Sequence, residues 1–456
     1  MLRQAAISGL LLCVALAANA RTRPHYGGTL RIEVHGDAWA PDGLARRLVL
    51  DGLTDLSDSG AAEPALAVQW SQTNHNQRWD FQLRPWVRFQ DGTPLNADAV
   101  VASFAAMCTN GASPDAANAA PKTPCPWNAV YAAGPLEVVF TTQTPSPDLP
   151  ELLAQTRFAV SKKDPSGVLL GTGPFQVSGF TNGALMLTAY ADCWQGRPFL
   201  DSVQILQHRS QRDQWLDLSV GNADIVEVPP ELLRQAQQQH MSVLVSGPVD
   251  LLTLTIPAQG VFKDAAMRQS AALAVDRASL YNVIFQKQGE ITASLLPQRV
   301  SGYAFLFATE RDLNRARAMR GGAFPTPLGM GTGPSGATMR LAGERLALNL
   351  HEAGFNVRMA PAGKPTAMDL QLIHLEETNP RAALDEMLAT FSLNATVNGT
   401  GAQALWEAES SALKNNTVVP LLWLPRAWAV GERVRDIRLS PDGEPLLADA
   451  SLEGAK

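Results

Sequence analysis

The chain lacks most of the patterns that mark a catalytic or metal centre. Its seven histidines never stand four residues apart, and none of them neighbours one of the four cysteines. Common zinc sites need such His/Cys spacing, so the sequence predicts no metal site. There is no Gly-x-Ser-x-Gly elbow and no phosphate loop of the Gly-x4-Gly-Lys type. These absences disfavour an enzyme, although a catalytic triad can still assemble from distant residues.

The charge balance excludes another class of function. The chain carries 37 Lys and Arg against 43 Asp and Glu, a net charge of -6, and has no long basic run. Nucleic-acid binding leaves a basic footprint, so we expect no nucleic-acid partner. A hydrophobic content of 46% with 18% charged residues is typical of a globular protein, and 456 residues predict two or more domains.

The N-terminus has the pattern of an export signal. Arg3 precedes an uncharged apolar run from Ala5 to Ala17, and the motif Ala18-Asn19-Ala20 follows. A charged start, a short apolar run and an A-x-A site define a secretory signal peptide. We therefore expect residues 1–20 to be removed, and the mature protein to be periplasmic or extracellular. Cys13 lies inside the apolar run, which leaves lipid anchoring open as an alternative.

Three cysteines remain in the expected mature chain. Cys108 and Cys125 flank a loop rich in Gly, Ala, Pro and Asn. Export permits disulfides, so this composition predicts an exposed insertion closed by a Cys108–Cys125 bridge. Cys193 is then left over, and we expect a buried free thiol there.

The most regular local pattern lies between residues 79 and 104. Trp79, Phe81 and Leu83 alternate with polar residues, which predicts a half-buried strand. Asp91-Gly92 has turn chemistry, and Asn96 is suited to cap a helix that follows it. The segment therefore reads as strand, turn and helix.

This segment also resembles a family signature, "tyrFxLRxgvkFxDGtPlxAeDVvxSf". The signature belongs to the dipeptide/oligopeptide-binding family of solute-binding proteins that serve ABC importers, and the match has no gap. Other segments resemble further elements of that family in the same order: Leu48–Leu56, Ala65–Trp70, Gly171–Val177, Tyr190–Ile205, Gly221–Val226, Phe262–Arg277 and Val418–Arg426.

The resemblance implies an α/β architecture with the two-lobed periplasmic-binding-protein (Venus flytrap) fold. The implied first lobe comprises residues 21–58, 165–250 and 418–456. A subdomain over residues 59–164 packs on it. The second lobe comprises residues 251–417 and is shorter than in the family, because two helical elements between 369 and 418 are trimmed. We expect residues 321–336, rich in Gly and Pro, to form an irregular connector.

The implied function is that of an extracytoplasmic solute-binding protein of an ABC importer. Such a protein captures a peptide-like solute between its lobes and delivers it to permease subunits in the membrane. A monomer without a cofactor is expected. Two alternatives remain: a degenerate family member that acts as a non-transport interaction or sensory module, and a secreted hydrolase.

Peptide-binding members use an acidic residue in a segment like "WxxDYxDP" to receive the ligand's α-ammonium group. The corresponding stretch here is Leu372–Pro380, in which Glu376 falls where that Asp would be, although the Trp, Asp and Tyr are missing. Glu376 is thus a candidate ammonium partner, and the alternative is a solvated acidic pair at a helix start. Arg381 is a candidate for binding a ligand carboxylate through two hydrogen bonds.

Two tryptophans complete the candidate site. Trp423 and Trp428 lie near the strand that returns to the first lobe. Side chains alternate along a strand, so one face of this strand turns inward to the cleft and the other to the core. Either indole is therefore a candidate for lining the cleft.

Overall fold

The structure, a computed structural model, describes residues 25–40, 43–57, 59–107, 125–304, 306–322, 327–333, 336–361, 363–376, 379–399 and 401–454. The expected signal peptide, Cys13 and Cys108 lie outside these residues. Within them, no helix is long and apolar enough to cross a membrane.

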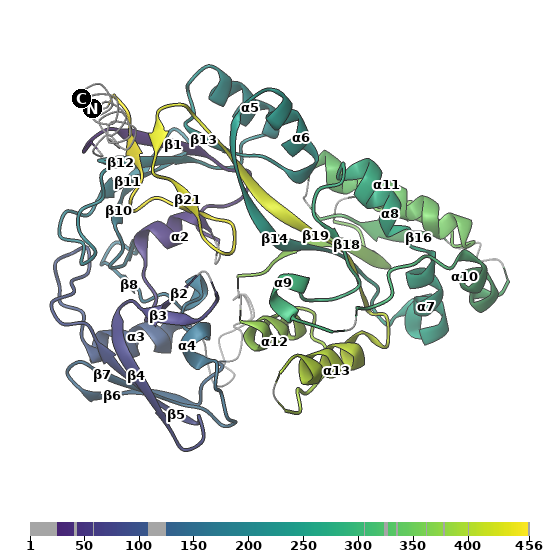
Figure 1. Cartoon of the computed structure of the whole chain (residues 1–456), viewed down its shortest axis with the longest axis horizontal. Helices are drawn as coiled ribbons and strands as arrows, with labels where there is room; N and C mark the ends of the chain where they lie inside the picture. The colour runs from purple at the N-terminus through teal and green to yellow at the C-terminus, as the bar shows by residue number, and fades with distance from the viewer. Residues whose placement is uncertain are drawn as a thin grey trace, which may run out of the picture.

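One eleven-stranded sheet runs through both halves of the molecule (Figure 1). Its order is β10-β11-β12-β1-β13-β19-β14-β18-β16-β17, and β15 pairs with β19. In the first half, the strands and helices are β1 (Thr29–Glu33), α2 (Leu44–Val49), β8 (Lys162–Lys163), β9 (Leu169–Leu170), β10 (Phe175–Thr181), β11 (Ala184–Ala189), β12 (Ser202–Leu206), α5 (Gln211–Ser219), β13 (Ile225–Glu227), α6 (Pro230–Gln238), β20 (Val434–Arg435), β21 (Arg438–Leu439), β22 (Pro445–Leu446) and β23 (Ser451–Leu452).

Two long strands, β14 (Ser242–Thr255) and β19 (Val418–Val430), connect the halves. They pair antiparallel from Ser242↔Val430 to Thr255↔Val418, with register shifts around Pro248. Pro248 stands opposite Pro425, and neither residue has an N–H to donate to the ladder. The two strands are therefore least tied to each other near their middle, between the two halves.

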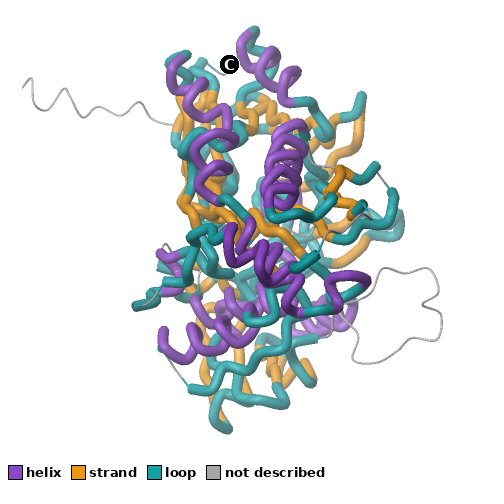
Figure 2. The backbone as a smooth tube through the Cα atoms, turned by 90° about the vertical axis from the view of Figure 1, so that its right-hand side faces the viewer, coloured by secondary structure: helices purple, strands orange, loops and turns teal. Residues whose placement is uncertain are grey.

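The second half contains α7 (Ala265–Ala274), α8 (Arg277–Ser279), β15 (Glu290–Ile291), α9 (Gln298–Ser301), α10 (Leu313–Arg320), β16 (Leu328–Gly331), α11 (Ala337–Glu352), β17 (Val357–Met359), β18 (Met368–His374), α12 (Pro380–Thr390) and α13 (Ala402–Leu413). Viewed from this end, helices lie in front of the strands (Figure 2). The apolar side chains of α11 and the strands, such as Leu346 and Met330, form one buried cluster.

The expectation of an irregular connector over residues 321–336 is wrong in part, because this stretch contains β16. Leu328 and Met330 point into the core, and the strand pairs parallel with both β17 and β18. Glycines alternate with these two apolar residues, so the local composition resembles a loop. Burial between two neighbouring strands decides the structure instead.

A separate four-stranded sheet carries the subdomain, whose elements are β2 (Thr54–Leu56), β3 (Ala62–Pro64), β4 (Ala67–Thr73), β5 (Arg78–Leu83), α3 (Ala97–Met107), β6 (Ala129–Gly134), β7 (Glu137–Thr141) and α4 (Leu149–Leu152). The predicted strand is confirmed as β5, in which Trp79, Phe81 and Leu83 are buried. Asn96 caps α3 as expected, since its Oδ1 accepts a hydrogen bond from the Ala99 N–H at 2.9 Å.

Distinct hydrophobic clusters mark the parts that we call the first lobe, the subdomain and the second lobe. The first-lobe core includes Ile32, Phe175 and Ile205, and the subdomain core is built around Phe81 and Phe140. The second lobe has two clusters, one under α7 and α11 and one under α9, α12 and α13. The residue boundaries predicted for these parts stay predictions.

A close backbone contact fixes the position of α2 in the first lobe. A Cβ atom on Gly171 would lie 2.1 Å from the carbonyl oxygen of Val49, and one on Gly173 would lie 2.8 Å from its carbonyl carbon. Only glycine allows this approach. Cys193 lies close by as a buried free thiol, as expected, and burial raises its pKa to about 11.

Candidate functional site

Charged side chains from both lobes meet beside the middle of the connecting strands. Asp250 lies on β14, opposite His374 at the end of β18. This register brings the His374 Nδ1 atom to 2.8 Å from Asp250 Oδ1. Arg426 on β19 adds a second cation, with its Nε 3.1 Å from Asp250 Oδ2. Asp250 is only 7% exposed, so a buried carboxylate is held between two cationic side chains.

The turn between β21 and β22 adds two carboxylates from the first lobe. Glu444 forms an ion pair with Arg426, and Asp442 Oδ2 lies 3.7 Å from His374 Nε2. Gly443 sits between them with a φ of +89°, a conformation that favours glycine. Its carbonyl accepts a hydrogen bond of 2.9 Å from the indole N–H of Trp428. Trp428 therefore anchors the turn through the Gly443 carbonyl. The carboxylate of Asp442 in this turn faces His374 of the second lobe.

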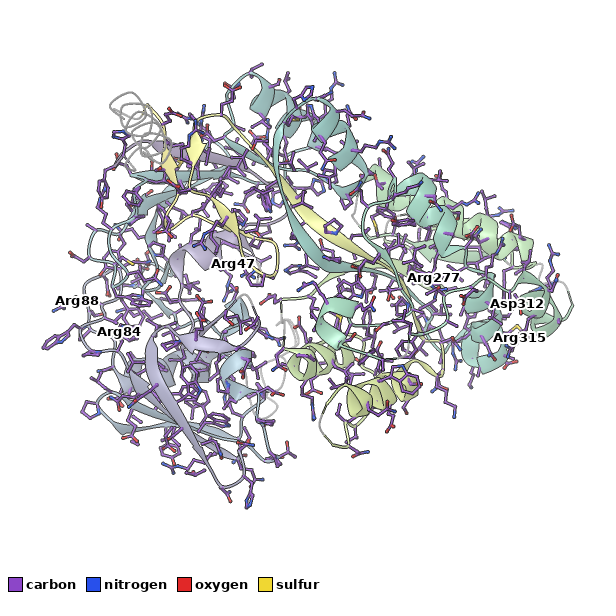
Figure 3. All side chains as sticks on the ribbon, viewed as in Figure 1. Arg47, Arg84, Arg88, Arg277, Asp312 and Arg315 are labelled. Atoms are coloured by element: carbon purple, nitrogen blue, oxygen red, sulfur yellow. The ribbon has the colours of Figure 1, made fainter. Side chains whose placement is uncertain are left out.

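Two arginines of α2 face the same place. Arg47 forms an ion pair with Asp442, and Figure 3 labels it on α2 toward the connecting strands. Arg46 precedes it, and its side chain forms no hydrogen bond within the residues that the structure describes. The Nε atoms of both arginines are buried without a hydrogen-bond partner in that part of the chain. We call Arg47, Asp250, His374, Arg426, Asp442 and Glu444 the interlobe network.

The network sets the charge of its own members. Burial and Arg426 lower the pKa of His374, but Asp250 and Asp442 outweigh them and raise it to about 9. His374 is therefore a cation at neutral pH. Burial raises the pKa of Asp442, but Arg47 and His374 pull it well below its usual value. Both groups are thus ionised, and each stabilises the other across the lobes.

Glu376 lies two residues beyond β18, on the second lobe, and is half-buried. Its carboxylate interacts electrostatically with both arginines of α2 and favours a higher pKa for each. Burial lowers the pKa of Arg46, and Glu376 opposes that effect. Glu376 also helps Asp442 to raise the pKa of Arg47 against burial. Glu376 therefore faces the first lobe, and its role as an ammonium partner stays a prediction.

Arg381 lies in the first turn of α12 rather than in the network. Its Nε is 3.1 Å from Asp385 Oδ2, and its side chain is 35% exposed. Arg381 also influences the pKa of Asp148, which lies just before α4 of the subdomain. Burial raises the pKa of Asp148 to about 6, Glu151 adds to this, and Arg381 opposes it. Arg381 thus faces the subdomain, and its contact with a ligand carboxylate stays a prediction.

The two candidate tryptophans are both buried. Trp423 lies in the second-lobe cluster under α9 and α12, and its exposed fraction is zero. Trp428 is 2% exposed in the first-lobe core. The two indoles enter the cores of different lobes, and nearly every residue of β19 is buried, so a strand face that turns to a cleft stays a prediction. In this arrangement neither indole has surface to offer a ligand, and their role as ligand contacts stays a prediction.

Sequence reasoning missed most of the site. Arg46, Arg47, Asp250, Arg426 and Asp442 were not singled out, because no local motif contains them. The distance along the chain explains this: Arg47 and Asp442 are 395 residues apart. One usable signal existed. A charged residue such as Asp250, inside a stretch that reads as a buried strand, needs a partner of opposite charge.

Comparisons with known proteins identify the fold. The structure is similar to that of the oligopeptide-binding protein AppA from Bacillus subtilis in complex with a nonapeptide. The TM-score is 0.76, with 16% sequence identity, over 94% of this chain and 100% of that one. At this level of identity the likeness shows the fold alone. The α/β two-lobed fold expected from the sequence is thereby confirmed.

Curated relatives are also similar in sequence. The nickel-binding protein NikA of Staphylococcus aureus is 21% identical over 276 residues, which are 59% of this chain and 54% of that protein. The probable D,D-dipeptide-binding periplasmic protein DdpA of Escherichia coli is 24% identical over 275 residues, 56% of this chain and 52% of that protein. These matches span about half the length of the two relatives.

The family itself is shown by a longer match. Residues 61–321 match the middle region of the bacterial extracellular solute-binding proteins of family 5, and this range is more than half of the chain. The family consists of binding proteins, in agreement with the expectation that the chain is not an enzyme. The chain therefore belongs to family 5 of the bacterial extracellular solute-binding proteins.

Proposed function

We propose that this protein is the extracytoplasmic solute-binding protein of an ABC importer and that it captures a peptide-like solute between its lobes. The observation that carries the proposal is the interlobe network. Arg47 and Asp442 of the first lobe meet His374 of the second lobe at the connecting strands β14 and β19. Similarity to DdpA and AppA, whose names specify a dipeptide and an oligopeptide, supports a peptide as the solute.

The connecting strands give this function its mechanism. Their register shifts around Pro248 where the lobes join, so rotation there disturbs few backbone hydrogen bonds. The contact of His374 with Asp442, at 3.7 Å, joins the second lobe to the first. A solute that touches both lobes adds further contacts to the closed state alone. It therefore shifts the population toward closure.

The proposed contacts with the solute follow from the sequence expectations. Glu376 receives a cationic group, such as the α-ammonium of a peptide, and Arg381 binds a carboxylate group. Trp423 and Trp428 are the proposed apolar contacts; because both are buried inside the lobe cores in the present arrangement, this part of the proposal requires their side chains to become uncovered. Enclosure removes water from the charged groups of the solute, which are then paired with fixed side chains.

Export and delivery complete the proposal. The signal peptide over residues 1–20 sends the chain across the membrane, and its mature form starts at Arg21. A bridge between Cys108 and Cys125 closes the loop of the subdomain. Permease subunits of the importer receive the loaded protein. N-terminal sequencing of exported protein tests the first point, because an acylated Cys13 would show a lipoprotein instead. Peptide mapping without reduction tests the second.

Solute capture is tested by titrating a dipeptide library, with intrinsic tryptophan fluorescence as the signal and small-angle scattering as the test of closure. Binding with a smaller radius of gyration supports the proposal. Binding of nickel ion but no peptide would replace the solute class. Peptide hydrolysis during the titration would favour the hydrolase, and binding of nothing in the panel would favour the degenerate sensory module.

A further inference from the structure

We propose that Arg46, on α2 of the first lobe, binds a carboxylate group of the solute, so that the solute is a carboxylic acid held by its acid end against the first lobe. This inference rests on the proposed function, because it names the chemistry of the same interlobe site. It assigns the carboxylate contact to Arg46 in place of Arg381 of the second lobe, which the sequence expectation named and which pairs with Asp385 instead.

The guanidinium group of Arg46 has donors for which the described part of the chain supplies no acceptor. A guanidinium has five N–H donors, and burying them without acceptors costs free energy. Arg46 is half-buried, yet its side chain forms no hydrogen bond in the described part of the chain, and its Nε atom is fully enclosed. Its neighbour Arg47 differs, because it forms an ion pair with Asp442. The enclosed Nε is out of reach of a solute, so it is the terminal N–H donors of Arg46 that are available at the place where the lobes meet.

The charges of the side chains around Arg46 are balanced. The interlobe network contains three cations, Arg47, His374 and Arg426, and three anions, Asp250, Asp442 and Glu444. Two further charged residues interact electrostatically with the network: Arg299 with Asp442, and Glu227 with Glu444 and Arg426. They add one charge of each sign. The network is thus neutral by itself. Arg46 and Glu376 come in addition, with opposite charges, from opposite lobes.

A zwitterionic solute fits this arrangement without disturbing the balance. Its carboxylate group takes the donors of Arg46, and its ammonium group takes Glu376. The site therefore remains neutral when the lobes enclose it. A phosphate dianion would also suit a guanidinium, but it would leave excess negative charge beside Asp442 and Glu444. A carboxylate accepts two parallel hydrogen bonds from one guanidinium, which gives specificity as well as affinity.

The test uses matched pairs of probes. Alanyl, leucyl and phenylalanyl dipeptides are titrated as free acids and as C-terminal amides, and tryptophan fluorescence gives the dissociation constants. In the unmodified protein we expect the acids to bind at least tenfold more tightly than the amides. Arg46→Gln should weaken binding of the acids at least tenfold and change binding of the amides less than twofold. Arg46→Lys should keep part of the preference, since it keeps the charge and loses the planar donors.

Two controls separate this inference from folding and from the proposed function. Arg345→Gln removes a partly exposed arginine of α11 and should leave both affinities unchanged. Thermal unfolding of Arg46→Gln should match the unmodified protein, because no hydrogen bond of Arg46 is lost. Equal binding of acids and amides, with closure intact, would overturn the inference and leave the proposed function standing. An acid preference that survives in Arg46→Gln would also overturn it. Binding of no probe would remove both.

Discussion

Two buried carboxylates of this protein show how differently one chemical group behaves in two regions. Asp250 in the interlobe network has cationic partners, and its pKa is below the usual value because Arg426 and His374 outweigh burial. Glu409 on α13 is fully buried, and its partners are neutral: the Ser294 hydroxyl at 2.8 Å, the Tyr303 hydroxyl at 2.6 Å and a backbone N–H.

The difference teaches what each region is suited to do. Burial raises the pKa of Glu409 to about 7, and its hydrogen bonds only partly oppose the shift. Glu409 therefore fixes α13 within the second lobe and is mostly protonated, and so uncharged, below about pH 7. Asp250 stays charged, so it holds two cations of the connecting strands and β18 together. Charge is retained at the lobe junction and suppressed inside the lobe.

The largest expected effect comes from removing the charge at the junction. Asp250→Asn leaves Arg426 and His374 buried without their shared anion. Removing one partner of a buried ion pair typically costs about 3–5 kcal/mol. Urea denaturation should show this loss of unfolding free energy. Asp449→Asn is the control, because its pair with Arg438 is exposed and should be worth less than about 1 kcal/mol. Similar losses in the two variants would contradict a buried network.

A pH titration of stability probes the other carboxylate. Glu409 is protonated in the folded protein up to about pH 7 but ionises near 4.5 when unfolded. Between these values the folded state binds more protons, so its stability falls as the pH rises. The shift corresponds to roughly 3 kcal/mol at 1.36 kcal/mol per pH unit. Glu409→Gln should flatten this part of the stability curve, whereas an unchanged slope would assign it to another group.

At the edge of the network, the expected effect is on binding. Glu376→Gln should weaken binding of a solute with an ammonium group at least tenfold, which is about 1.4 kcal/mol. The reason is that the ammonium would stay enclosed without an anion. Fluorescence titration with a free dipeptide measures the change, and an N-acetylated dipeptide is the matched control. Equal losses for the two peptides would contradict direct pairing with the ammonium group.

The smallest effect is expected where the subdomain faces α12. Asp148 has a pKa of about 6, raised mainly by burial, so its ionisation opposes the folded state above that pH. Asp148→Asn should therefore stabilise the protein at pH 7, by about 1 kcal/mol after allowance for its partial exposure. The gain should vanish near pH 3 and below, where the carboxyl is mostly protonated in both states. Denaturation at these two pH values checks the expectation.

Local patterns made much of the fold predictable, and long-range pairing limited the prediction of the site. The roles of Trp79, Phe81 and Asn96 could be predicted, because a strand and a helix cap depend on residues that are close in sequence. The family resemblance supplied the lobes. His374 and Asp250 meet through a strand register over 124 residues, which no short window contains. β16 was missed because glycines interrupt its apolar residues.

The contact of Gly171 and Gly173 with Val49 has a consequence for how this binding surface can be altered. Any side chain at either glycine must push the C-terminal end of α2 away. Arg46 and Arg47 lie on that short helix and would move together. A single substitution at Gly171 or Gly173 would thus shift two cationic groups at once. Because of this backbone contact, the positions of Arg46 and Arg47 can change only together.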